Sequence, residues 1–411
     1  LNFQDLYEWA ETATLTPVVS TLLGLALIAG PIGKCAQFPL HMWLDEAMEG
    51  PNPASILRNS VVVACGAYVL IKLQPILILS PVASIALITL GTMTAIGASL
   101  VALAQIDIKR ALSHSTSAYL GIVFIAVGMQ WTNVALLVLL AHAVAKALLF
   151  MSVGSIILTT STQDITEMGG LRSRMPATTT AYLVGAAGMV GVVPLGGFWA
   201  LREGLNAFWY DDFWVVPVLL LVNGLTALNL VRVFRLVFLG TPQIKTRRAP
   251  EVPWTMALPM VTLTIITLVF PAILQRVYLL PNWAYLNWAA CGLLVVSGVI
   301  GGSIGALMPL SRVWSRSIQM PLKFFQDLLA YDFYIDRLYR LTVVGFVDNF
   351  SKFSAWFDRY IVDGLVNLVG LASIFSGEGL KYSVSGQSQA YLLTILIGIS
   401  LLGVVLTYSF W

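Results

Sequence analysis

Long apolar stretches, each about as long as a helix needs to cross a bilayer, recur along almost the whole chain. Because an α-helix satisfies its backbone hydrogen bonds internally, we expect an all-α, polytopic transmembrane helix bundle. The pattern predicts ten spans, at residues 16–38, 55–79, 84–106, 115–130, 133–158, 180–199, 213–239, 254–274, 285–307 and 387–410.

Basic residues gather on one side of the predicted spans. Lys72, Arg202 and Arg276 lie on or near the other side. By the positive-inside rule, the richer side faces the cytoplasm. Its members are Lys109, Arg110, Arg172, Arg174, Lys245, Arg247, Arg248, Arg312, Arg316 and Lys323.

Residues 320–375 have a different pattern, in which charged residues alternate with aromatic and aliphatic ones. A single helix of this length would reach roughly 80 Å, about twice the thickness of a bilayer, so it should lie along the membrane surface. We therefore predict a long lateral amphipathic helix. The alternative is two or three shorter surface helices, broken at Gly345 and Gly364.

Composition excludes several classes of protein. Of the 411 residues, 58% are hydrophobic and 10% charged, and the net charge of +3 is too small and scattered to indicate nucleic-acid binding. Cys35, Cys65 and Cys291 lie in apolar segments without paired spacing, so we expect neither disulfides nor metal ligands. No signal peptide is expected, because Leu1 is followed by a polar run.

Ionisable residues within predicted spans are costly, so each is a candidate for function. Lys34 follows Gly30 and Pro31 in the first span, where the proline can open the helix. The alternative is a lysine that reaches the nearby end of the span. His142 and Lys146 are four residues apart, so they share one helix face and suit a proton relay. The alternative for His142 is an ordinary core histidine.

Two further groups of charges lie at span ends. Arg202 and Glu203 follow the break at Pro194, where either a polar exit path or an interfacial ion pair fits. Asp107, Lys109, Arg110 and His114 form a cytoplasmic cap, from which we expect Lys109 to turn inward. No motif for a nucleotide, an iron–sulfur cluster or zinc is present, so we expect no cofactor on this chain.

Four motifs carry a resemblance to a known family. They are Gly30-Pro31-Ile32-Gly33-Lys34-Cys35-Ala36-Gln37-Phe38-Pro39-Leu40-His41-Met42-Trp43-Leu44, Ala47-Met48-Glu49-Gly50-Pro51-Asn52-Pro53, Asp107-Ile108-Lys109-Arg110 with Ser115-Thr116, and Ala141-His142-Ala143-Val144-Ala145-Lys146-Ala147-Leu148-Leu149-Phe150. In this order they resemble the antiporter-like, proton-translocating subunits of complex I. The surface helix and last span resemble the lateral arm of the subunit 5 family, and residues 245–253 are similar to its cyanobacterial and plastid branch.

The resemblance implies a subunit of a proton-translocating NAD(P)H or ferredoxin–plastoquinone oxidoreductase in a cyanobacterial thylakoid membrane. Plastoquinone and iron–sulfur clusters would then lie on other subunits, and the partners would be lipids and the membrane subunits that the lateral helix contacts. Family members have several more spans before the lysine-bearing helix, so we expect an N-terminal half to be absent from this sequence.

In these terms the chain divides into four parts. Residues 1–240 are the antiporter-like core, corresponding to the second half of the family's inverted repeat, and residues 241–319 are additional spans. Residues 320–375 are the lateral helix, and residues 376–411 are the C-terminal anchor.

The chain departs from the family pattern at three titratable positions. Asn59, with Arg58 beside it, stands where a histidine is common; Val138 replaces a second histidine, and Leu201 replaces a lysine beside Arg202. This divergence resembles the CO2-uptake form of the subunit, which pairs with a carbonic-anhydrase-like protein. The resulting relay hypothesis comprises Lys34, Lys109, His142 and Lys146, with Arg58, Arg202 and Glu203 as variant-specific groups. The alternatives are a subunit of a multi-subunit cation/proton antiporter and a non-pumping docking scaffold.

Overall fold

The computed structural model describes residues 2–280, 287–307 and 320–409. Arg312 and Arg316 of the basic face lie outside the described residues, as do the predicted span ends at residues 285 and 410. The chain divides into two compact units, Leu1–Ile335 and Asp336–Trp411, which are treated separately.

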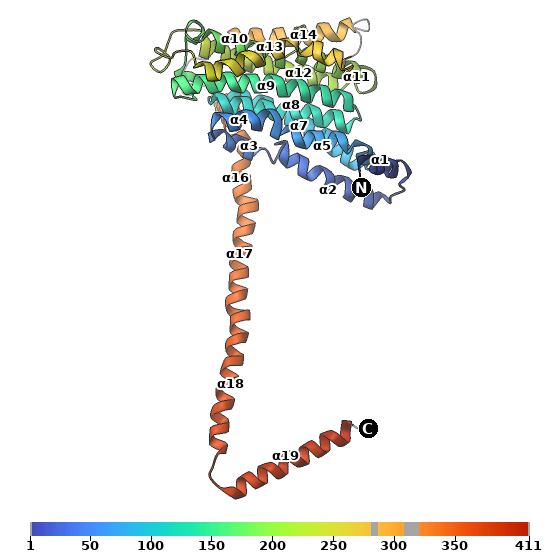
Figure 1. The fold of residues 1–411 in the computed structure, drawn as a ribbon, viewed down its shortest axis with the longest axis vertical. Helices are drawn as coiled ribbons and strands as arrows, with labels where there is room; N and C mark the ends of the chain where they lie inside the picture. The colour runs from blue at the N-terminus through green and yellow to red at the C-terminus, as the bar shows by residue number, and fades with distance from the viewer. Residues whose placement is uncertain (1, 281–286, 308–319, 410–411) are drawn as a thin grey trace. The chain divides into compact units, whose positions relative to one another are not determined.

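The first unit is a stack of helices that runs from α1 and α2 to α13 and α14 (Figure 1). Its helices are α1 (Phe3–Thr12), α2 (Pro17–Lys34), α3 (Met42–Glu46), α4 (Asn52–Leu57), α5 (Ala64–Lys72), α6 (Gln74–Leu77), α7 (Pro81–Ala104), α8 (Ile108–Gly128), α9 (Thr132–Thr160), α10 (Pro176–Met189), α11 (Gly196–Asp211), α12 (Val215–Phe238), α13 (Trp254–Arg276), α14 (Trp288–Leu307) and α15 (Met320–Ala330).

Helix α8 lies at the centre of this unit, where it packs against α7 and α9. All of its residues except Arg110 are buried. Asp107 begins the helix, because its carboxylate accepts hydrogen bonds from the backbone amides of Lys109 and Arg110. The chain thus places its most polar spanning segment, Ser113 to Ser117, inside the bundle rather than against lipid.

Within the described ranges, ten helices are long and apolar enough to cross a membrane, and nine of them coincide with predicted spans. The tenth is the long lateral helix. The span predicted at 180–199 is interrupted, as the break expected at Pro194 implies: α10 ends at Met189 and α11 begins only at Gly196. Pro194 lies in the connecting segment, where a missing amide donor is tolerated. The bundle therefore contains a broken helix, as its fold class predicts.

Helix α2 ends inside the predicted first span. Pro31 lies within its last turn, and the helix stops at Lys34. The indole of Trp43 donates to the carbonyl of Gly33 at 2.8 Å, which satisfies one acceptor freed by the end of the helix. The helix therefore continues through Pro31 and ends one turn later, at Lys34.

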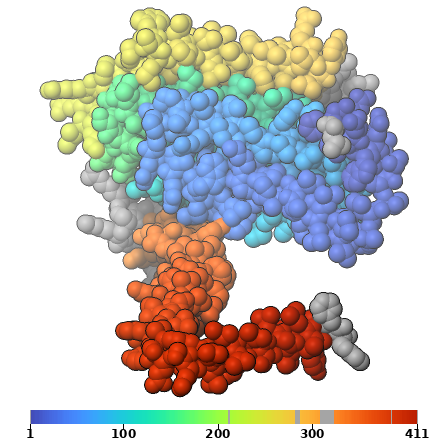
Figure 2. All heavy atoms as spheres, turned by 60° about the horizontal axis from the view of Figure 1, so that its bottom comes forward, coloured from blue at the N-terminus to red at the C-terminus, as the bar shows by residue number. Residues whose placement is uncertain are grey.

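The second unit consists of one long helix and α19 (Ser388–Ser409). The long helix runs through α16 (Ile335–Tyr339), α17 (Gly345–Phe357) and α18 (Asp363–Ser383), which are joined by the π-helical segments η8 (Arg340–Val344) and η9 (Asp358–Val362). It is continuous through Gly345 and Gly364, so the alternative of separate helices is not realised. The stretch Asp332–Tyr382 has 51 residues, and its α-helical part begins at Ile335. Many apolar side chains along α17 to α19 are exposed; these helices are orange to red in Figure 2.

Candidate functional site

Lys146 is fully buried on α9 and points toward α8. Its ammonium donates to the Ser115 hydroxyl at 2.5 Å and to the carbonyl of Leu112 at 2.7 Å. In the part of the chain that the structure describes, no carboxylate lies within salt-bridge distance of it. The amine is therefore held by two neutral oxygen atoms, which suits a group that exchanges a proton.

His142 lies one turn before Lys146, as the spacing predicts, and is 2% exposed. Its ring stacks on the ring of Tyr119, with 5.6 Å between the centroids and 28° between the planes. Neither ring nitrogen has a hydrogen-bond partner among the described residues. The ring of His142 therefore has two unused hydrogen-bonding positions.

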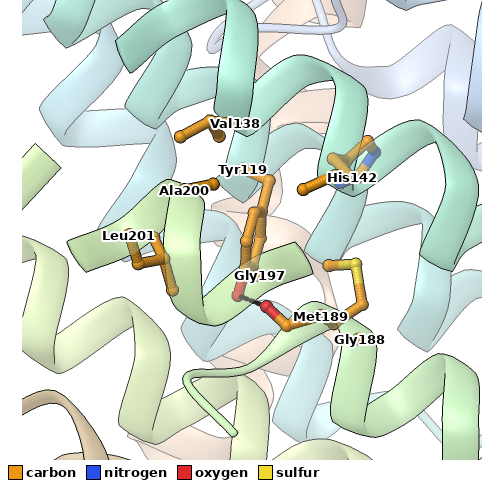
Figure 3. Close-up of a pocket in the computed structure, with 9 residues that line it drawn as sticks. Tyr119, Val138, His142, Gly188, Met189, Gly197, Ala200 and Leu201 are labelled. Atoms are coloured by element: carbon orange, nitrogen blue, oxygen red, sulfur yellow. Dashed lines mark hydrogen bonds between the residues drawn. The ribbon is translucent and has the colours of Figure 1, made fainter. Parts of the chain in front are cut away.

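Tyr119 joins this histidine to the broken helix. Its hydroxyl donates at 2.6 Å to the carbonyl of Met189, the last residue of α10 (Figure 3). A carbonyl at a helix end has no partner within its own helix, so a buried end needs such a donor. Tyr119 thereby fixes the break next to His142.

A small enclosed pocket separates His142 from α11 (Figure 3). Val138 and Leu201 line it from α9 and α11, at two of the positions where the sequence departs from the family pattern. The other lining residues are Tyr119, Ala141, His142, Gly188, Met189, Gly197 and Ala200, and the space between them is too narrow for a water molecule. Apolar side chains thus lie between His142 and the part of α11 that ends at Leu201. Arg202 and Glu203 follow Leu201 on that helix.

Arg202 and Glu203 form an ion pair at 3.2 Å. Arg202 is 1% exposed, and its guanidinium lies over the Trp199 ring at 5.9 Å. The Arg202 side chain is therefore inside the protein, whereas that of Glu203 is 27% exposed. The polar exit path and the interfacial ion pair both remain compatible with this geometry.

Lys109 turns inward, as expected. Its ammonium donates to the carbonyls of Met48 and Gly50 at 3.1 and 2.9 Å. The guanidinium of Arg58 donates to the neighbouring carbonyl of Ala47 at 2.8 Å. Two cations thus donate to backbone carbonyls of the turn η1 (Ala47–Glu49) and of Gly50 after it.

Arg58 is half-buried and begins the π-helical segment η2 (Arg58–Val62). The nearby carboxylate of Glu49 pairs with Arg110 at 3.6 Å and not with Arg58. Asn59 is fully buried and donates to the carbonyl of Ser55 at 3.1 Å, but its side-chain oxygen has no partner among the described residues.

The structure brings only part of the predicted relay together. Lys109 lies on α8, Lys146 donates to Leu112 and Ser115 of the same helix, and His142 is one turn from Lys146 on α9. Lys34, in contrast, is exposed at the end of α2. In the described structure it therefore lies outside the buried cluster.

Sequence reasoning missed two residues of this region. Ser115 was noted only as part of a motif, although it is the hydrogen-bond partner of Lys146. Arg232 on α12 is 3% exposed and donates to the carbonyl of Gln105 at 2.9 Å. The rule used for the other charges could have found Arg232, because it lies within the predicted span 213–239. The described residues contain no group of side chains arranged to hold a metal ion.

Comparisons with known proteins agree with the motifs. Residues 1–226 match the family model described as "NADH:quinone oxidoreductase/Mrp antiporter, TM". The chain is 56% identical over 409 residues to NAD(P)H-quinone oxidoreductase subunit 5, organellar chromatophore 2, of Paulinella chromatophora, covering 99% of this chain and 66% of that protein.

More distant relatives give the same match. The chloroplastic subunit 5 of Chaetosphaeridium globosum is 32% identical, over 97% of this chain and 67% of its own length. NAD(P)H-quinone oxidoreductase chain 5 of a Picosynechococcus species is 30% identical, over 98% of this chain and 68% of its own length. The chain thus spans about two thirds of the length of these relatives.

Proposed function

Because this chain belongs to the NADH:quinone oxidoreductase/Mrp antiporter transmembrane family, we propose that it is the antiporter-like membrane subunit 5 of an NAD(P)H-quinone oxidoreductase and moves protons. One observation carries the proposal: Lys146 is buried in the centre of the bundle and bound only by neutral oxygen atoms. An intramembrane lysine is expensive unless it has a function.

In this proposal the chain conducts charge and carries out no redox step. Lys146 and His142 hold the proton within the bundle, Lys109 holds it at the η1 turn, and Lys34 exchanges it at the end of α2. The donor is NADPH, NADH or ferredoxin, and plastoquinone and the iron–sulfur clusters lie on other subunits. The relatives named chloroplastic and the cyanobacterial relative support a thylakoid location.

The test is purification of the intact complex from its native membrane through a tag on this chain. We expect the other membrane subunits of an NAD(P)H-quinone oxidoreductase and quinone-reductase activity to co-purify. If the chain instead purifies alone, or with subunits of a cation antiporter, the proposal is wrong.

The finer proposal is that the complex is coupled to CO2 hydration through a carbonic-anhydrase-like partner. Its support is that Asn59, Val138 and Leu201 differ from the family pattern. Val138 and Leu201 line the narrow pocket beside His142. Arg58 adds a half-buried guanidinium with no carboxylate partner in the described structure. A guanidinium stays charged and cannot relay a proton, but it can hold bicarbonate, the anion that CO2 hydration produces.

Replacing Arg58 with Ile and Asn59 with His tests the finer proposal. We expect this double variant to impair CO2 uptake in cells more than it impairs quinone reduction. Arg276→Ile is the matched control, since Arg276 is exposed at the end of α13 and far along the chain from this turn. If CO2 uptake and quinone reduction both stay at wild-type rates in the double variant, Arg58 has no such role.

A cation/proton antiporter is the second candidate, because the matching family model also covers such antiporters. The long helix of the second unit and the subunit 5 relatives favour the oxidoreductase. Sodium-dependent proton movement in vesicles that contain the purified protein would favour the antiporter instead.

A further inference from the structure

A second group of buried titratable side chains lies outside the lysine–histidine site. His41 and His114 are 1% and 2% exposed, and their ring centroids are 6.2 Å apart. Each histidine has a carboxylate next to it: Asp332 beside His41, and Asp45 beside His114. The group joins the segment after α2, helix α3 and helix α8 to the last turn of the first unit.

The contact between His41 and Asp332 is the shortest of this group. The Nε2 of His41 lies 2.5 Å from a carboxylate oxygen of Asp332, although the two residues are 291 positions apart. The contact is buried, because Asp332 is 7% exposed. Two aromatic rings pack beside this contact. The ring centroid of Phe38 lies 4.1 Å from that of His41, and the ring centroid of Phe333 lies 5.9 Å from that of Phe38.

The backbone at Asp332 is in an unfavourable conformation. Asp332, Phe333 and Tyr334 have φ angles of 50°, 56° and 55°, and none of them is glycine. Three successive residues in the left-handed region persist only where their surroundings hold them. The hydrogen bond of His41 and the packing of Phe333 supply this constraint directly before the long helix begins at Ile335.

The two carboxylates, Asp45 and Asp332, differ in the number of cationic side chains within salt-bridge distance. Asp45 lies 3.4 Å from His114 and 3.5 Å from Arg110, so it keeps a cation whatever the state of the histidine. For Asp332, His41 is the one cationic partner within salt-bridge distance among the residues described. When His41 loses its proton, a buried carboxylate is left without a compensating charge, which is costly.

We propose that His41 and Asp332 form a protonation-dependent latch that holds residues 323–335, the end of the first unit, against the segment after α2. With His41 protonated, the ion pair is complete and the left-handed turn is held. With His41 neutral, the turn loosens. Histidine is the side chain whose charge changes most readily near neutral pH.

The elements near the latch carry other charged groups. Helix α7, which packs against α15, carries no charged side chain. The remaining groups are Asp45 on α3, Glu49 on η1, Arg110 and His114 on α8, and Lys323 and Asp327 on α15.

Amide hydrogen exchange of residues 323–335, measured in the purified full complex, tests the latch. Asp332→Asn keeps the shape of the side chain but removes its charge, and we expect exchange there to rise about tenfold. Exchanging the two residues, with His41→Asp and Asp332→His together, should restore much of the protection. Asp336→Asn is the matched control, because Asp336 is an exposed partner of Arg340 four residues further on.

The pH profile of the wild-type protein tests the latch without any variant. As the pH is raised across neutrality, exchange of residues 323–335 should rise beyond the intrinsic pH effect. Asp332→Asn should remove this additional rise. A flat wild-type profile, or wild-type protection in Asp332→Asn, would overturn the latch. Neither result bears on the proposed function, because the readout is amide exchange and not proton transport.

Discussion

The ammonium of Lys146 and the hydroxyl of Ser115 are hydrogen-bonded across α9 and α8, with 2.5 Å between the two atoms. A buried cation usually has a carboxylate partner, and removing its proton would then leave a buried negative charge. Here the second acceptor is also neutral, the carbonyl of Leu112. Loss of the proton from Lys146 therefore leaves an uncharged pair, which favours proton exchange at this residue.

Lys146→Ala should lower proton pumping in vesicles that contain the whole complex, while assembly of the complex stays intact. Alanine keeps the helix but removes the charge that the relay uses. The measurement is the proton uptake of the vesicles per quinone reduced. Lys352→Ala is the control, because Lys352 is exposed and pairs with Asp348 at 2.6 Å on the long helix. Unchanged pumping in Lys146→Ala would contradict the relay assignment.

Gly197→Ala should destabilise the break between α10 and α11. A Cβ atom at Gly197 would lie 2.5 Å from the carbonyl oxygen of Gly188 and 2.7 Å from that of Met189. Backbone atoms cannot move aside as a side chain can, so we expect a loss of about 1–3 kcal/mol or more. Thermal unfolding of the purified complex measures the loss. Gly292→Ala is the matched control, since a Cβ there meets nothing within 4 Å, and equal stability of the two variants would contradict the packing argument.

Much of the fold follows from the sequence because one physical requirement dominates it. A run of about 20 apolar residues must be helical in a bilayer, and nine predicted spans are confirmed on this basis alone. Pro194 marked the break in the sixth span, but the sequence did not show that the helix already ends at Met189, because residues 190–195 are as apolar as the helix before them. Continuity of the long helix at Gly345 and Gly364 was also undecidable, since a glycine weakens a helix by only about 1 kcal/mol.

The candidate site was predictable only within single helices. His142 and Lys146 were found because four residues make one turn, a local rule. Ser115 is 31 positions from Lys146, and the contact depends on how α8 packs against α9. The exposure of Lys34 likewise depends on packing rather than on its motif. Local spacing therefore identified the relay residues on α9 but not their partners.

Acidification should loosen the contact between α3 and α8. Burial, the largest single influence, would raise the pKa of Asp45, but its close contact with His114 and the charges of His114, Arg110 and His41 together lower it. A carboxyl whose folded pKa lies below its unfolded pKa stabilises the fold above the unfolded pKa. This contribution is lost as the pH falls below about 4 and through the folded pKa.

Amide hydrogen exchange of residues 42–57 in the purified complex, corrected for the intrinsic pH effect, measures this loosening. Asp45→Asn should show weaker protection near neutral pH and no further loss on acidification. Asp164→Asn is a control, because Asp164 caps a surface turn through the amide of Thr166. An acid-induced loss that persists unchanged in Asp45→Asn would show that another group causes it.

Removal of the chain from Met320 onward should release this subunit from its complex. The long helix carries exposed apolar side chains over most of its length, among them Phe346, Phe350, Phe353 and Trp356. A continuous apolar surface of this extent exceeds the few hundred Å² found on soluble monomers, so either protein or lipid must cover it. A helix that runs along neighbouring subunits would bury far more surface than one edge of the bundle, and its loss should reduce co-purification of those subunits to background.

A second truncation distinguishes protein contacts from lipid contacts. Removal of residues 386–411 deletes α19 and keeps the long helix, so we expect co-purification to survive in part. If lipid alone covers the long helix, both truncated chains should co-purify with their partners as the intact chain does. Equal loss in both truncations would instead assign the attachment to α19. The long helix is supported as the element that binds the neighbouring subunits only by one pair of results. These subunits must co-purify with the chain that lacks residues 386–411 and must not co-purify with the chain that lacks everything from Met320 onward.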